Sequence, residues 1–269
     1  MIGIAKRMLL DKWRSLMVYI ASSLAFSEMY VALYPTLRDQ LTNLEGFLEA
    51  FPKEFMEAFG FTAETMSFAT VESLMATEMF SFIWPIILII LAVSLANYSF
   101  AGDVEKGTIE LTISQPLSRT KIFLSRYLTG AFLIVFFVAT TVYGIILLAA
   151  IHNIEYNFEA YTKMTFLGVM FGVCVYSLAT FFSTLFSEKG KTSFALVGVI
   201  ITMYAVNIAA GLKDSLEKFK YFTLFNYFDT GKALVRVEYV DYALLVFVLV
   251  FVFFTVLSWL RFIKRDIAV

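Results

Sequence analysis

The stretch MFSFIWPIILIILAVSLANYSFA, residues 79–101, decides the fold class, because it contains no charged side chain. About twenty apolar residues in a helix, each rising about 1.5 Å, cross a hydrocarbon core about 30 Å thick. The whole chain of 269 residues is 60% hydrophobic and 16% charged, with a mean hydropathy of +0.79. Soluble domains contain fewer apolar and more charged residues. The sequence therefore predicts an all-α, polytopic membrane protein.

Five further apolar runs accompany this one, and together they predict a single transmembrane domain over residues 1–269 with six membrane-spanning helices. The expected spans lie at about 16–34, 79–101, 122–151, 164–186, 194–212 and 242–263. The outer loop 35–78 carries leucines at helical spacing, which predicts amphipathic extracytoplasmic helices. The basic first dozen residues, followed by Trp13, predict an interfacial helix on the inner membrane surface.

The distribution of basic residues predicts the orientation in the membrane. Thirteen of the 21 Lys and Arg residues lie in the N-terminal segment, the links 102–126 and 187–193, and the C-terminal segment. Lys and Arg near span ends are enriched on the cytoplasmic side. We therefore expect a multi-pass protein of the cell membrane with both termini in the cytoplasm.

The composition argues against several function classes. The net charge of −1 gives no reason to expect a nucleic-acid partner. The single Cys174 and the single His152 argue against a disulfide framework and a metal site. No pair of residues within the spans predicts a catalytic site. Residues 190–192, Gly-Lys-Thr, resemble the end of a phosphate-binding loop, but Leu185 occupies the position where that loop needs glycine. We therefore expect no ATP site in this chain.

Three polar residues within the predicted spans are candidates for a transport route: Glu28, Asn97 and Asn207. An acid inside a bilayer is costly and is often functional. Glu28 either lines a route or lies near the outer surface beside a base such as Arg38. The two asparagines either form hydrogen bonds between spans, which is the commoner role, or face a cavity. His152, at an outer span end, is expected to be solvated.

The link 102–121 contains more structural signals than a connector needs. Thr108 to Ser114 predicts a short amphipathic helix, in which Ile109 and Ile113 share a face. Pro116 ends that helix, because proline lacks an N–H group. Ser118 is a typical N-cap for the third span. The link is either a charged surface loop with well-capped ends or a rigid element that meets a partner.

The order of residues in this link resembles a family signature. EKGTIELTISQPLSR, residues 105–119, is similar to the E-x-G-T-x-E-x-L-x-S-x-P-x-S-R segment of the membrane subunits of type-2 ABC transporters. Weaker similarities at 51–60, 227–228 and 262–267 extend the resemblance over most of the chain. Thr112 departs from the pattern, since the family commonly has an aliphatic residue there.

The resemblance implies a permease subunit that works as a homodimer or heterodimer with two separate ATPase subunits. ATP and Mg²⁺ would bind to those partners, and this chain would need no cofactor. Segment 102–121 would dock on the ATPase as a coupling helix and drive alternating access, most often for export. The residues that match the motif or lie on the helix face are Glu105, Gly107, Thr108, Ile109, Glu110, Ile113, Ser114, Pro116, Ser118 and Arg119.

Two other functions remain open at this point. A stand-alone secondary transporter would need ionisable residues near the middle of the membrane, and Glu28 is the only such residue in the predicted spans. A membrane scaffold without transport activity is the other alternative. The sequence does not indicate which substrate would be carried.

Overall fold

The computed structural model describes residues 2–41, 69–109 and 117–265, and the regular elements in these ranges are helices. Six of the helical segments are long and apolar enough to cross a membrane, which confirms the predicted fold class. The spans are formed by α1 (Ile2–Leu41), α5 to α6 (Val71–Ser99), α9 (Arg119–Ile151), α10 (Phe158–Leu185), α11 (Lys189–Leu212) and α13 (Ala243–Lys264).

The first span differs from the prediction, because α1 is one continuous helix of 40 residues. The separate interfacial helix expected over the first dozen residues is therefore wrong. No glycine or proline lies between Lys6 and Leu16, so nothing in the local sequence interrupts the helix. At its other end α1 continues through Pro35, beyond the predicted boundary.

The second span begins earlier than predicted and has three parts: α5 (Val71–Leu74), the π-helix η1 (Met75–Ile83) and α6 (Trp84–Ser99). Hydroxyl groups satisfy a carbonyl in the wide π turns, since Ser81 Oγ donates to Ala76 O at 2.6 Å and Thr230 Oγ1 donates to the same atom at 3.0 Å. Most of the predicted outer loop, with its amphipathic helices, lies outside the described residues.

The core forms around α10, which packs against α6, α9 and α13. Trp84 is fully buried there and stacks on Phe137 and Phe228. Its indole Nε1 donates to Thr141 Oγ1 at 2.9 Å, so the polar edge of this large side chain is satisfied inside the membrane domain. By contrast, α11 and α13 are the least buried of the spans.

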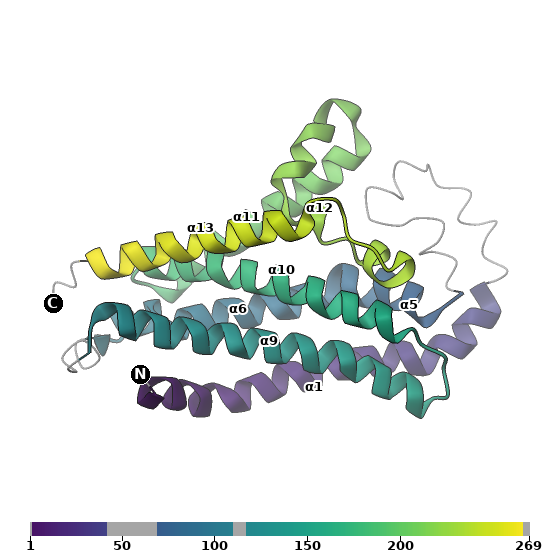
Figure 1. The fold of residues 1–269 in the computed structure, drawn as a ribbon, viewed down its shortest axis with the longest axis horizontal. Coiled ribbons are helices and arrows are strands. Elements are labelled where there is room, and N and C mark those ends of the chain that lie inside the picture. The colour runs from purple at the N-terminus through teal and green to yellow at the C-terminus, as the bar shows by residue number, and fades with distance from the viewer. Residues whose placement is uncertain (1, 42–68, 110–116, 266–269) are drawn as a thin grey trace.

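Both chain termini lie at one end of the helix bundle, which we call the termini end (Figure 1). The short helix α7 (Ala101–Glu105), the start of α9 and the α10–α11 link are at this end. The opposite end, called the far end, contains the last turns of α1, α5 and the link between α9 and α10. Between α11 and α13 the chain forms η2 (Asp214–Phe222), α12 (Leu224–Tyr227) and η3 (Lys232–Arg236), and η3 packs against α5.

Candidate functional site

The segment that resembles a coupling helix leaves the membrane domain at a fixed break after α6. Phe100 has φ −134° and ψ −70°, which interrupts the helix between α6 and α7. Ser183 of α10 satisfies backbone groups on both sides of the break: its Oγ donates to Ala96 O at 2.8 Å and accepts the N–H of Ala101 at 3.0 Å. The break between α6 and α7, where the segment begins, is therefore fixed against α10.

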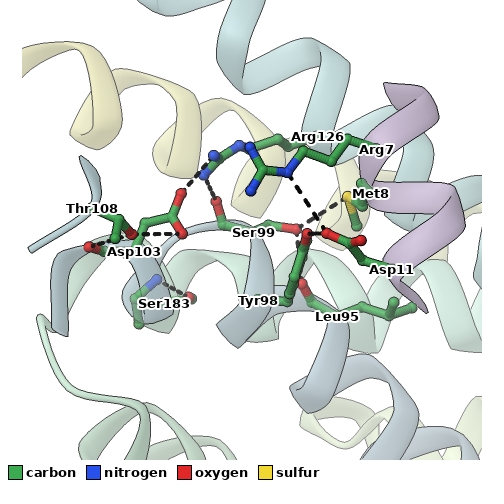
Figure 2. Close-up of polar contacts among 11 residues, drawn as sticks. Arg7, Met8, Asp11, Leu95, Tyr98, Ser99, Asp103, Thr108, Arg126 and Ser183 are labelled. Atoms are coloured by element: carbon green, nitrogen blue, oxygen red, sulfur yellow. Dashed lines mark hydrogen bonds and ion pairs between the residues drawn. The ribbon is translucent and has the colours of Figure 1, made fainter. Parts of the chain in front are cut away.

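Asp103 connects α7 to α9 through an ion pair (Figure 2). Arg126 Nη2 lies 2.6 Å from Asp103 Oδ2, and Arg126 Nη1 also donates to the carbonyl of Ser99. The two side chains are only 12% and 24% exposed, so solvent screens the pair much less than a surface pair. Thr108 Oγ1 donates to Asp103 Oδ1 at 3.3 Å, which ties the following turn to the same carboxylate.

Glu105 connects the segment to α11. Its Oε2 accepts the N–H of Lys189 at 2.9 Å, and Lys189 is the first residue of that helix. The first N–H groups of a helix lack intrahelical partners, and a carboxylate there also interacts favourably with the helix dipole. Asn97 adds a second link, since its Nδ2 donates to Ser193 Oγ at 3.0 Å and to Lys189 O at 3.4 Å.

Gly107 permits the sharp turn after α7. Its φ of +68° lies in the left-handed region, which costs a side-chain-bearing residue about 1–2 kcal/mol. In this turn the N–H of Gly107 donates to Val104 O at 3.0 Å and that of Thr108 donates to Asp103 O at 2.9 Å. The left-handed backbone at this position therefore explains why glycine occupies this place of the E-x-G-T pattern in this chain.

Replacing Gly107 by alanine is expected to lower the free energy of unfolding by roughly 1 kcal/mol, because alanine is strained at a positive φ. The control is Gly190→Ala in α11, where an added Cβ would meet open space and alanine is the better helix former. Thermal unfolding midpoints of the two purified variants in detergent check this prediction. Equal midpoints would contradict the assigned role of Gly107.

Ser118 is the N-cap of α9, as predicted: its Oγ accepts the N–H of Lys121 at 3.3 Å. The returning end of the segment, which leads into α9, is therefore fixed at the first turn of that helix.

Arg119 and Arg265 fasten this returning end to its neighbours. Arg119 Nη1 donates to the carbonyls of Ile263 and Arg265 at 3.0 and 2.8 Å, at the end of α13. Arg265 in turn donates to Thr184 O at 3.0 Å and to Ser187 Oγ at 2.6 Å. Burial and the charge of Arg261 lower the pKa of Arg265, although a guanidinium remains charged at neutral pH.

Four of the predicted coupling residues lie outside the described residues: Glu110, Ile113, Ser114 and Pro116. Their expected helix therefore stays a prediction. Thr108, expected to begin it, lies in the turn after α7, and Ile109 is buried.

The intramembrane polar candidates do not meet at one place. Glu28 was expected to line a route or to pair with a base such as Arg38, and its Oε1 lies 2.7 Å from His152 Nε2 at the far end. His152 is therefore not simply solvated. Asn97 lies at the termini end, and Asn207 Oδ1 accepts a hydrogen bond from Thr223 Oγ1 at 3.0 Å, next to α12. In this structure both asparagines hold elements together.

Two acids at the far end, Glu72 and Glu78, fall within the predicted outer loop 35–78. Both lie in the helical second span. Glu72 is buried, and its Oε1 accepts the N–H of Asn157 at 2.7 Å. It also lines a cavity of about 630 Å³ with Tyr34, Arg38 and the link 152–157. Within the described ranges, no group of three His, Cys, Asp or Glu side chains could hold a metal ion.

These features define a polytopic membrane protein with six candidate spans among the described residues, in which a charged segment at the termini end is bonded to several of these spans. The profile of the DUF2705 family, described as proteins of unknown function, matches residues 47–268. The chain belongs to this family. No curated protein matches the sequence.

Proposed function

We propose that this chain is the membrane-spanning permease subunit of an ABC transporter whose ATP is hydrolysed by a separate subunit. One observation carries the proposal: three residues that match the family motif, Glu105, Ser118 and Arg119, also bond the segment to the helices, and Asp103, just before the motif, does the same. Asp103 and Glu105 fix the outgoing side, and Ser118 and Arg119 fix the returning side. A surface loop that only connects two helices does not need such attachments.

The attachments suggest how movement of the segment would reach the membrane. Asp103 acts on α9 through Arg126, Glu105 acts on the first turn of α11, and Arg119 acts on the end of α13. A partner that closes on ATP and shifts the segment would therefore displace three spans together. Such concerted movement is what alternating access requires. The resemblance favours an exporter that works as a dimer of permease subunits, with ATP and Mg²⁺ on the partner.

The proposal places the termini end in the cytoplasm, where the ATPase would be. In a Cys174→Ala background, a cysteine at Lys106 should react with a membrane-impermeant maleimide only after intact cells are permeabilised. A cysteine at Lys218, on the other side, should react in intact cells. Reversed labelling would contradict the orientation. Cys174 is fully buried in α10, and the background variant must first be shown to insert normally.

Purification of the tagged chain from its native membranes in a mild detergent tests the function. We expect an ATP-hydrolysing protein to be retained in stoichiometric amount. The proposal would be contradicted if the chain is folded and monodisperse but retains no ATPase. This must hold under every detergent and salt condition in which a known ABC complex survives.

A stand-alone secondary transporter is the second candidate, and the acids within the candidate spans favour it. Glu28, Glu72 and Glu78 all lie in helices that could cross the membrane, and ionisable groups there often mark ion routes. Ion uptake by proteoliposomes that contain this chain alone, driven by an imposed proton or sodium gradient, would support this alternative. A scaffold without transport activity would show neither ion uptake nor a bound ATPase.

A further inference from the structure

Three lysines from different helices gather at the termini end, where the nearby carboxylates of Asp11 and Glu105 are bonded to other groups. Lys12 lies on α1, Lys106 ends α7, and Lys189 begins α11. The ammonium group of Lys12 is within electrostatic range of the other two. Asp11 is also near Lys12, but its carboxylate accepts a hydrogen bond from Tyr98 and pairs with Arg7. Among the described residues, none of the three lysine ammonium groups forms an ion pair.

The fold holds two of these lysines in place despite their mutual repulsion. Lys12 Nζ lies 4.6 Å from the centroid of the Tyr98 ring and 3.5 Å from Ser94 Oγ, both on α6. Lys189 folds over α7, where a Cβ on Gly102 would lie 2.8 Å from its Cε. Glycine at position 102 therefore provides the space for this side chain. Gathering like charges costs energy unless an anion is bound among them.

An apolar face leads from this cluster along the second span. Phe82, Ile86 and Ile90 follow one another at intervals of four residues and are 56%, 40% and 51% exposed. The next residue on that face is Ser94, which contacts Lys12. Residues four apart share a helix face, and the distance from Phe82 to Ser94 is about 18 Å at about 1.5 Å per residue. One leaflet of the hydrocarbon core is roughly 15 Å thick, so the face matches a lipid chain in length.

We propose that Lys12, Lys106 and Lys189 bind the phosphate headgroup of an anionic phospholipid from the inner leaflet, with its acyl chain along Phe82, Ile86 and Ile90. The positive cluster recognises the charge, and the apolar face distinguishes a lipid from a free phosphate. A second copy fits less well. A twofold axis beside this face would bring the three lysines close to the same lysines of the copy, so the permease dimer proposed above would use another face.

Titration of the delipidated full-length chain with phosphatidylglycerol and phosphatidylcholine of identical acyl chains, read by native mass spectrometry, tests this site. We expect the wild-type chain to prefer phosphatidylglycerol by roughly tenfold or more, since each lysine near an anionic headgroup adds to the attraction. The triple variant K12Q/K106Q/K189Q should lose the preference. The control K191Q/K213Q/K218Q, with the same change in charge, should keep it.

Further outcomes make the result decisive. Lysine-to-arginine changes at the three positions should preserve the preference, which separates loss of charge from loss of folding. Equal binding of both lipids by the wild-type chain, or a preference that survives the glutamine changes, would overturn the proposal. Equally tight binding of glycerol phosphate, or a dimer lost in the triple variant without lipid selectivity, would assign the cluster to a soluble anion or a second copy. The assay contains no ATPase, so its outcome is independent of the proposed transport function.

Discussion

Replacing Arg126 by methionine is expected to lower the free energy of unfolding by about 2–3 kcal/mol and to reduce the coupling of ATP hydrolysis to this chain. Breaking a fully buried ion pair typically costs about 3–5 kcal/mol. Arg126 and Asp103 keep slight contact with solvent, which reduces the expected loss. Because the pair joins the segment to α9, stimulation of the partner ATPase should fall roughly tenfold, within the usual range of coupling energies.

A neighbouring arginine provides the control for this experiment. Arg7 pairs with Asp11 at 3.8 Å, and its side chain is 83% exposed, so Arg7→Met should cost no more than about 0.5 kcal/mol. The double variant Asp103→Asn with Arg126→Met completes a mutant cycle, which isolates the energy of the pair. SDS titration of the purified variants measures stability. A loss no larger than that of Arg7→Met would contradict the role given to the pair.

Replacing Glu110 and Ile113 together by alanine is expected to release the partner ATPase while the chain still inserts and folds. By the resemblance, these side chains belong to the surface that meets the partner, and a few central contacts dominate most interfaces. Retention of the ATPase during purification should fall roughly tenfold or more, the loss that about 1.4 kcal/mol produces. The thermal unfolding midpoint should stay within the range expected for changes at a surface.

The matched control changes the same kinds of side chain elsewhere: Glu217→Ala with Phe219→Ala in η2. Both residues are exposed, and the proposed topology places them on the opposite side of the membrane. This variant should retain the ATPase like the wild-type chain. Equal retention by the Glu110 and Ile113 variant would show that segment 102–121 is not the docking element.

The features that could be predicted from the sequence are those encoded locally. Six apolar runs of sufficient length predicted six spans, because only a helix satisfies its own backbone groups in a membrane. Ser118 was identifiable as an N-cap from its position after a proline and before an apolar run. The second span was harder: Thr70, Glu72 and Glu78 make residues 70–78 look like a loop. The structure nevertheless extends the helix to Val71, because Thr70 caps α5 together with Ser73 and Glu72 accepts the N–H of Asn157.

The attachments of the segment could not be predicted, because they join residues far apart in the sequence. Glu105 bonds to Lys189 and Arg119 bonds to Arg265, and no local spacing encodes either contact. The pairing of Glu28 with His152 was missed for the same reason. The sequence indicated which residues were unusual for a connector, whereas only the fold showed which helices they touch.

Site-specific photo-crosslinking tests the central claim most directly. Benzoylphenylalanine would replace Glu110, Ile113 or, as the control, Lys218, and membranes would be irradiated with and without ATP. The account predicts a covalent adduct between an ATPase subunit and positions 110 and 113, with a yield that changes with ATP, and no adduct from position 218. Absence of an ATPase adduct from both segment positions, with the chain inserted and folded, would contradict the account.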